Sequence, residues 1–245
     1  MPPLKLVFRA GRKELTVGTV PRVVGTLSSL ARPFPAPRQK VCCDVVEVRL
    51  DKAGPPADWL ARCQAIQDRG WPVLLTARLK SEGGAWKGWD ANRFDIFEEA
   101  MTELAGVDIE WRSKIVFPVA ILAKRKRRVC VISYHDFEKT PPLEKLEDII
   151  AEAQELASIV KISTRLHEAG DEEILRSLLA RKWKRPLCVI GMGPAWTHTR
   201  VLFPKLGSCL AYGYLDKATA PGQLSAADLT RRLGEEMAAD AKTEH

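Results

Sequence analysis

The chain has 245 residues, of which 46% are hydrophobic, so it can bury a large core and is too apolar for an intrinsically disordered protein. Its sequence contains no uninterrupted run of eighteen apolar residues, and residues 1–14 carry charges where a secretory signal peptide is apolar, so we expect a cytoplasmic protein without a membrane span. The 38 Lys and Arg outnumber the 31 Asp and Glu, and the resulting net charge of +7 suits an anionic partner.

Strand-like segments recur along the whole chain. The first twenty residues alternate around Ala10 and Gly11, which predicts a β-hairpin over residues 1–20. Eight short β-branched or apolar runs follow and predict eight strands. They are VVGTL (23–27), DVVEVRL (44–50), VLLTARL (73–79), VDIEW (107–111), RVCVISY (128–134), SIVKIS (158–163), LCVIGM (187–192) and CLAYGYL (209–215).

Segments with helical spacing lie between most of these runs, as in residues 92–106 and 142–158. Strands that alternate with helices predict parallel βαβ units, and eight of them in about 250 residues match a closed (β/α)₈ TIM barrel. An open doubly wound sheet normally has fewer strands, and no G-x-G-x-x-G follows the first run. We therefore predict one α/β domain over residues 1–245, with the barrel in residues 21–245 and the hairpin over one mouth.

The end of the barrel and its basic segment give two local signals. Ser225 is a candidate N-cap, with Asp228 three positions later, and predicts a last helix. The densest basic segment, AKRKRRVC (123–130), lies where a helix would end before a strand, a position that favours cations. It lacks interleaved aromatic residues and any nucleic-acid motif, so we predict no nucleic-acid partner.

The cysteines indicate neither a metal site nor a disulfide framework. No C-x-x-C spacing occurs, and most cysteines lie in apolar, strand-like runs. The six are Cys42, Cys43, Cys63, Cys130, Cys188 and Cys209. We expect reduced, buried thiols.

Ionisable residues gather near the carboxyl ends of the predicted strands. Glu47 and Arg49 are two apart and share one face of their strand. Arg78 ends the third run, His135 closes the fifth, and Lys161 lies inside the sixth. Each could be structural, as part of an ion network or as a core histidine. Since barrel enzymes build their sites at this end of the strands, the set together predicts one site.

Lys161 suggests a particular chemistry because β-branched residues flank it. Burial favours the neutral amine, which can attack a ketone and form an imine. Alternatively, its ammonium could pair with Glu47 or Glu110 inside the barrel. An imine needs a proton-transfer partner, and His135, expected one strand away and at the same depth, is suited to that role.

Six motifs in this order resemble those of one enzyme family. They are EVRLD (47–51), TARLKSEGG (76–84), SYHDF (133–137), VKIS (160–163), GMG (191–193) and APGQLS (220–225). From Pro21 to Ser225 the chain resembles type I 3-dehydroquinate dehydratase of the shikimate pathway. The resemblance implies the (β/α)₈ fold, dehydration of 3-dehydroquinate to 3-dehydroshikimate without metal or cofactor, and a homodimer.

The resemblance also implies roles for individual residues. Lys161 would form a Schiff base with the substrate ketone. His135 would remove the neighbouring proton and protonate the departing hydroxyl, and Glu82 would orient His135. The implied substrate-binding residues are Glu47, Arg49, Arg78, Arg200, Gln223, Met192 and Thr219. The first three would hold the ring hydroxyls and the next two the carboxylate; the methionine would pack on the ring, and the threonine stands where the family often has serine.

The chain departs from the family pattern after GMG, where it reads PAWTHTR (194–200). Arg200 keeps its distance from Met192, so the resemblance still includes it. We interpret His198 as a surface-loop histidine rather than a second proton carrier, and Trp196 as a rigid wall. Two other functions remain open: another Schiff-base barrel such as a class I aldolase, and a non-catalytic barrel that serves as a binding module.

Overall fold

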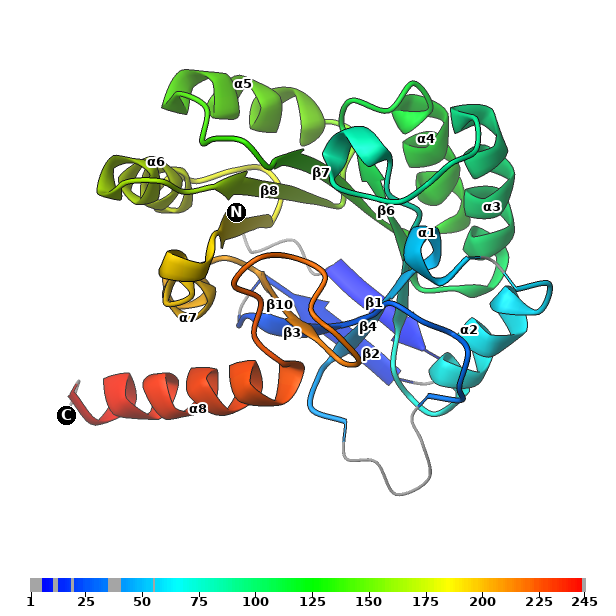
Figure 1. Ribbon diagram of the computed structural model, residues 1–245, viewed down its shortest axis with the longest axis horizontal. Helices are drawn as coiled ribbons and strands as arrows, with labels where there is room; N and C mark the ends of the chain where they lie inside the picture. Colours follow the sequence, from blue (N-terminus) through cyan, green and yellow to red (C-terminus); the bar gives the residue numbers. More distant parts are fainter. Residues whose placement is uncertain (1–5, 11–12, 19, 35–40, 55, 244–245) are drawn as a thin grey trace.

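Eight parallel strands form the centre of the molecule. The computed structural model describes residues 6–10, 13–18, 20–34, 41–54 and 56–243 (Figure 1). The strands are β3 (Arg22–Leu27), β4 (Val45–Arg49), β5 (Val73–Thr76), β6 (Gly106–Glu110), β7 (Val129–Asp136), β8 (Ile159–Arg165), β9 (Leu187–Met192) and β10 (Leu210–Tyr214). They are hydrogen-bonded in the order β10-β3-β4-β5-β6-β7-β8-β9, and the amide of Cys209 donates to the carbonyl of Leu187 at 2.9 Å where the two edges meet. The eight predicted runs are therefore the eight strands of a nearly closed barrel.

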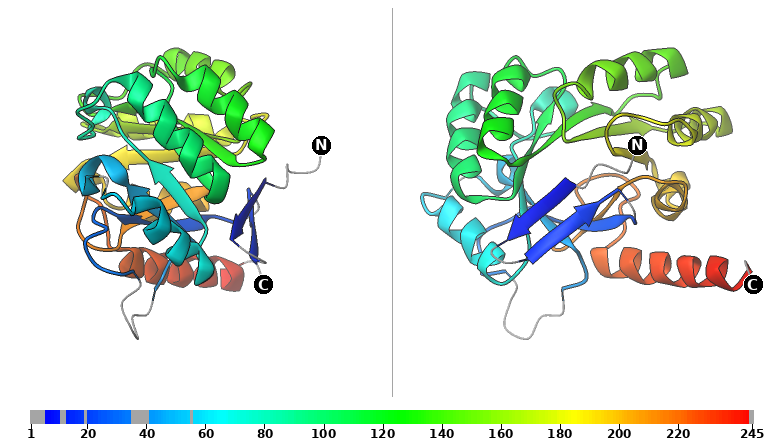
Figure 2. Two further views of the ribbon diagram at one scale, coloured as in Figure 1. Left: turned by 90° about the vertical axis from the view of Figure 1, so that its right-hand side faces the viewer. Right: turned by 180° about the vertical axis from the view of Figure 1, so that it is seen from behind.

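Helices surround the sheet (Figures 1 and 2). They are α1 (Leu50–Ala53), α2 (Trp59–Asp68), α3 (Asp90–Glu103), α4 (Val116–Lys126), α5 (Leu143–Ala153), α6 (Ala169–Ala180), α7 (Thr199–Lys205) and α8 (Ala226–Thr243), with short 3₁₀ turns η1 (Lys80–Glu82) and η2 (Pro194–Trp196). The alternation of strands and helices confirms the predicted (β/α)₈ barrel. No helix among the described residues is both long and apolar enough to cross a membrane.

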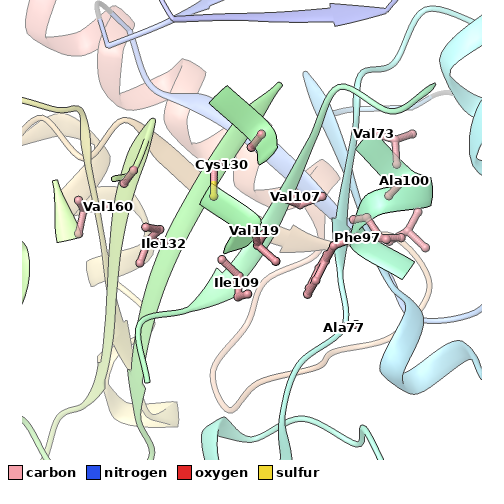
Figure 3. Close-up of a cluster of buried hydrophobic side chains, with 14 of the residues drawn as sticks. Val73, Ala77, Phe97, Ala100, Val107, Ile109, Val119, Cys130, Ile132 and Val160 are labelled. Carbon is pink, nitrogen blue, oxygen red and sulfur yellow. The ribbon is translucent and has the colours of Figure 1, made fainter. Parts of the chain in front are cut away.

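The main apolar layer lies between the strands and the helices. Phe97 of α3 and Val119 of α4 are fully buried against Val107 and Ile109 of β6 (Figure 3). Alternate residues of each strand face this layer, and the residues between them face the barrel interior. This alternation turns Glu47, Arg49, Asp108 and Lys161 toward the interior.

The described part of the predicted hairpin is present and closes one mouth, while residues 1–5, 11–12 and 19 of the predicted range lie outside the described residues. Strands β1 (Leu6–Ala10) and β2 (Lys13–Val17) pair antiparallel and lie across the barrel in the right-hand view of Figure 2. Leu15 and Val17 are buried in one cluster with Val45 and Val129, the first residues of β4 and β7. Apolar side chains thus seal the amino ends of the strands and leave the carboxyl ends for the functional loops.

Local sequence signals agree with the helix ends. The amide of Asp228 donates to Ser225 Oγ at 3.0 Å, which confirms the predicted N-cap of α8. The basic segment supplies the last turn of α4 with Lys124, Arg125 and Lys126, as expected from the helix dipole. Four of the six cysteines are buried, as predicted: Cys63, Cys130, Cys188 and Cys209. Cys42 and Cys43 are only half-buried because they precede β4, so the expectation was wrong for these two.

Candidate active site

All ten site residues expected from the sequence line one pocket at the carboxyl ends of the strands. They are Glu47, Arg49, Arg78, Glu82, His135, Lys161, Met192, Arg200, Thr219 and Gln223. Their elements are spread from β4 to the loop after β10, so only barrel closure brings them together. The ten residues predicted from the sequence therefore lie in a single pocket, and the contacts of each one indicate what it can do there.

Lys161 is 4% exposed and lies on β8, where its side chain points into the barrel. Its Nζ is 3.1 Å from Oδ2 of Asp108, a β6 residue that sequence reasoning did not single out. The sequence offered Glu47 or Glu110 as the ion partner, but Glu110 pairs with Arg93 instead. The Lys161 amine is thus held beside a carboxylate in a site nearly closed to solvent.

Asp108 is shared between two cations. Its Oδ1 accepts hydrogen bonds from Arg78 at 2.7 Å and from Ser133 Oγ at 2.6 Å, while Oδ2 faces Lys161. Burial by itself would raise the pKa of Asp108, but the charges of Arg78 and Lys161 outweigh burial and lower this pKa to about 2. Asp108 therefore remains a carboxylate at neutral pH.

His135 and Glu82 form the second pair in the pocket. Oε2 of Glu82 accepts the backbone amide of His135 at 2.9 Å and lies 3.1 Å from Nδ1 of the same residue. Burial, with the positive charges of Arg78 and Lys161, holds the pKa of His135 well below its usual value. An imidazole that donates from Nδ1 to Glu82 keeps a free lone pair on Nε2, which suits it to accept a proton.

The glycines after Glu82 explain why it can reach this place. Gly83 has φ +74°, and a Cβ on it would lie 2.3 Å from the ring of Phe137. A Cβ on Gly84 would lie 2.0 Å from the carbonyl oxygen of Arg78. Only glycine fits at these two positions, because the backbone after η1 passes so close to Phe137 and Arg78.

Glu82 is itself an unusual carboxylate. It is 1% exposed, and its Oε1 has no hydrogen-bond partner among the described residues. Burial raises the pKa of Glu82 to about 7, although Arg78 acts in the opposite direction. The Glu82–His135 pair therefore gains or loses a proton near neutral pH.

The depth of His135 differs from the prediction. In the parallel ladder of β7 and β8, Ser133 is opposite Lys161 and His135 is opposite Ser163. His135 thus lies two residues nearer the barrel mouth than Lys161, so the expectation of equal depth was wrong. The stagger between neighbouring strands sets this offset of two residues.

Glu47 and Arg49 face the interior from β4, as their spacing predicted. The hydroxyls of Thr26 and Thr76 donate to the two oxygens of Glu47, each at 2.9 Å. The guanidinium of Arg49 binds both oxygens of Asp51 at 2.9 Å. Each side chain is therefore fixed by neighbours and presents only its remaining polar atoms to the pocket.

Arg200, on α7, is the exception among the pocket arginines. It is 6% exposed and has no ion pair among the described residues, and its guanidinium donates only to the carbonyl of Pro221 at 3.4 Å. Burial lowers the pKa of Arg200 to about 10. A buried guanidinium without a carboxylate is a ready site for an anionic group of a ligand.

The loop after β10 folds over Arg200. Oε1 of Gln223 accepts from the amide and the hydroxyl of Thr219 at 2.7 and 3.1 Å, so its NH₂ group remains available as a donor. Gly222 has φ +71°, and a Cβ there would lie 2.4 Å from the carbonyl oxygen of Gly193. This close approach brings the PGQ and GMG motifs together on the side of the pocket opposite Glu82.

Comparisons with known proteins agree with this geometry. A family model described as type I 3-dehydroquinase matches residues 25–237. The chain belongs to the type I 3-dehydroquinase family. Two proteins named 3-dehydroquinate dehydratase are similar to it: that of Methanocella arvoryzae is 36% identical over 191 residues, covering 78% of this chain and 86% of that protein. That of Methanothrix thermoacetophila is 34% identical over 216 residues, covering 87% and 91%.

A solved structure supports the fold independently. The type I 3-dehydroquinate dehydratase of Clostridium difficile superposes with a TM-score of 0.83 over 96% of this chain and 99% of that chain, at 22% identity. Sequence identity this low speaks for the barrel alone. Family membership therefore rests on the family model and the two relatives, and the barrel on the structure.

The segment that departs from the family pattern lies partly outside the pocket. His198 is exposed, and its Nε2 is 2.7 Å from Oε2 of Glu172, which agrees with a surface-loop histidine. Trp196 packs against the apolar layer between the strands and the helices, and a Cβ on Gly193 would lie 3.0 Å from Cδ1 of its ring. Trp196 does not line the pocket. Neither residue contacts the Lys161 or His135 side chain in the described structure.

Sequence reasoning missed pocket residues whose types carry no obvious chemical signal. They are Thr26, Phe137, Ser163, Ile190 and Tyr212. Sequence reasoning also missed Asp108, an ionisable residue that contacts Lys161 without lining the pocket. The period-two alternation of the strands could have found Asp108, because it shares an inward face with Gly106 and Glu110. Among the described residues no group of three or more His, Cys, Asp or Glu side chains is arranged to hold a metal ion.

Proposed function

We propose that this chain dehydrates 3-dehydroquinate to 3-dehydroshikimate, in the shikimate pathway, through a Schiff base on Lys161. The observation that carries the proposal is the arrangement of the pocket. A buried lysine and a histidine–glutamate pair lie at one end, and a buried arginine without a carboxylate lies at the other. Family membership and relatives named for this activity support it.

The first stage is imine formation. Lys161 first gives up a proton, and the lone pair of its amine then forms the C–N bond to the ketone carbon. The nitrogen loses a second proton as the imine forms, and the carbonyl oxygen leaves as water with the two protons that the nitrogen has released. The protonated imine then withdraws electrons from the adjacent carbon, so the protein itself provides the electron sink and no metal or cofactor is needed.

The second stage is proton transfer. The neutral His135 removes a proton from the carbon next to the imine, and the resulting imidazolium returns a proton to the departing hydroxyl. Glu82 holds Nδ1 so that Nε2 faces the substrate and stabilises the transient positive charge. Water then hydrolyses the imine and releases the amine.

The remaining residues hold the substrate. Arg200 binds the carboxylate with its planar fork, and the free NH₂ of Gln223 donates to the same group. The hydroxyls and polar ring edge contact Glu47, Arg49 and Arg78 through atoms that their protein partners leave free. Two further side chains complete the enclosure: Met192 packs on the ring and Thr219 fixes Gln223.

Several broader features belong to the same proposal. The chain acts as one domain over residues 1–245, with residues 1–20 as an accessory hairpin and residues 21–245 as the barrel. It works in the cytoplasm as a homodimer on a small anionic substrate, without a nucleic-acid or membrane partner. The family resemblance and the composition support these points.

Borohydride trapping tests the proposal. The protein is incubated with 3-dehydroquinate and reduced, the modified lysine is found by mass spectrometry, and the conjugated enone is followed by ultraviolet absorbance. An adduct on Lys161 with new absorbance supports imine dehydration. An adduct without absorbance points to another Schiff-base enzyme such as an aldolase, and neither signal points to a non-catalytic binding module. Lys161→Met is the control for non-specific reduction.

A further inference from the structure

Tyr212 is one of the pocket residues that the proposed reaction leaves without a role, and it is the one that contacts Lys161. It lies on β10, is 5% exposed and lines the pocket together with Lys161. The Nζ atom of Lys161 lies over the tyrosine ring, 4.0 Å from its centroid. A cation at this distance over an aromatic face is attracted by the negative face of the ring, and the attraction is strongest where water is excluded.

The other contact of Nζ is already shared. Asp108 reaches Nζ with Oδ2 at 3.1 Å, while its Oδ1 accepts from Arg78 and Ser133. The single negative charge of Asp108 therefore serves two buried cations. The ring of Tyr212 is the second group in direct contact with the reactive nitrogen.

We propose that Tyr212 is a further catalytic residue, whose ring face stabilises the positive charge on Nζ of Lys161 when that nitrogen becomes the imine cation. The inference rests on the proposed function, since it requires the imine on Lys161. It adds a charge-stabilising group to the nucleophile, the proton carrier and the substrate-binding residues.

The chemistry of the nitrogen explains why a ring suits this position. An ammonium has three N–H donors, whereas a protonated imine keeps one, and its charge spreads onto the adjacent carbon. A carboxylate such as Asp108 then accepts from that one N–H. The ring face needs no donor and attracts the delocalised charge throughout, while it neither gives nor takes an electron pair or a proton.

The hydroxyl of Tyr212 points to the ring as the active part. This oxygen is sealed from solvent and has no hydrogen-bond partner among the described residues. Burial, followed by the charge of Glu47, raises the pKa of Tyr212 well above its usual value, so the ring stays uncharged. Because a buried unpaired hydroxyl is destabilising, we expect Tyr212→Phe to melt at an equal or higher temperature.

A fluorination series at position 212 tests the proposal without changing the shape of the side chain appreciably. Phenylalanine and its mono-, di- and trifluoro derivatives are incorporated, and the rate of borohydride trapping on Lys161 by 3-dehydroquinate is measured. We expect phenylalanine to trap within about twofold of the native rate. Each added fluorine should lower the trapping rate further, because fluorine withdraws negative charge from the ring face. The trifluoro variant should trap about tenfold more slowly than the phenylalanine variant.

Position 134 provides the matched control. The ring of Tyr134 also lies under a cation, Arg112 at 4.3 Å, but it belongs to the apolar layer outside the barrel. The same fluorinated residues at position 134 should leave trapping on Lys161 unchanged. Melting temperatures for both series verify that every variant is folded.

The outcomes separate this inference from the proposed function. If the native protein gives no adduct on Lys161, the Schiff-base function fails and the role of Tyr212 fails with it. If the native adduct forms and trapping is flat across the fluorinated series, only the role of Tyr212 is overturned. A loss on Tyr212→Phe that fluorination does not deepen would assign the effect to the hydroxyl and would also overturn the role of the ring.

Discussion

The two ends of the pocket treat buried charge in opposite ways. On the β4 to β8 side each arginine or lysine is paired: Arg49 with Asp51, and Arg78 and Lys161 with Asp108. On the β9 and β10 side Arg200 has no carboxylate among the described residues. Paired charges hold one another in place before substrate arrives, whereas an unpaired buried charge is satisfied when an anion binds. The paired side therefore suits chemistry and the unpaired side suits recognition.

Replacing Lys161 should have the largest effect on the paired side. Lys161→Met keeps the length of the side chain but has no amine, so turnover should fall by about 10⁴-fold or more. Asp108 keeps Arg78 as a partner, and the fold should survive. Steady-state absorbance and a melting curve measure the two effects. Lys184→Met, at an exposed ion pair with Glu155, is the matched control and should turn over normally. Full activity in Lys161→Met would rule out the covalent mechanism.

His135→Ala should lower turnover by roughly 10³-fold, since general acid–base catalysis contributes about two to four orders of magnitude. The amine of Lys161 remains, so an adduct should still be trapped by borohydride, although more slowly. Measuring both quantities on one sample separates proton transfer from imine formation. An unchanged turnover, or the complete loss of trapping in a folded variant, would contradict this division of roles.

Arg200 and Arg49 provide a direct test of the contrast between the two sides. Arg200→Met should lower kcat/KM by about 100-fold, mainly through KM, because hydrogen bonds to an anionic substrate group are lost. Its free energy of unfolding should stay the same or rise, since the variant removes an unpaired buried charge. Arg49→Met leaves Asp51 buried without its ion-pair partner, so the free energy of unfolding of this variant should fall by about 3 kcal/mol.

Urea unfolding at one pH measures both free energies, and initial rates over a range of 3-dehydroquinate concentrations give KM. The contrast between the two sides would be wrong if Arg200→Met were the less stable variant of the two. It would also be wrong if Arg200→Met left KM unchanged.

The sequence predicted the elements better than their mutual register. Periodicity identifies strands and their inward faces, which is why Glu47, Arg49 and Lys161 were expected in one interior. The offset between His135 and Lys161 was missed because it depends on how two strands are staggered, and no single strand sequence contains that information.

The ion partner of Lys161 was missed for a related reason. The sequence offers several carboxylates on neighbouring strands as partners. Glu110 is already paired with Arg93, and Glu47 accepts from two threonines, so Asp108 is the carboxylate that contacts Lys161. Partner selection among buried charges is a property of the whole network. Motif resemblance could name the reactive residues, but it did not supply their surroundings.

Replacing Glu82 should have the smallest effect on kcat/KM of the changes at the paired side, and this effect should depend on pH. With its pKa near 7, Glu82 is protonated in acid and then no longer presents a carboxylate to His135, so kcat/KM should rise about tenfold as pH increases through 7. Glu82→Gln should reduce the rate at pH 8 by about tenfold and flatten this limb. Asp136→Asn, at a half-buried carboxylate on the same strand end as His135, serves as the control and should keep the limb.

Stability should move in the opposite direction to activity. The folded pKa of Glu82, about 7, exceeds the usual value of 4.5, so the folded state favours the protonated form. The resulting contribution is fully present below pH 4.5 and is lost as pH rises through 7, which amounts to roughly 3 kcal/mol. Glu82→Gln remains neutral throughout, so its free energy of unfolding should exceed that of the native protein at pH 8 and approach it at pH 5. A native protein whose stability and kcat/KM both increased from pH 5 to pH 8, with Glu82→Gln following the same curves, would show that Glu82 is not the titrating group.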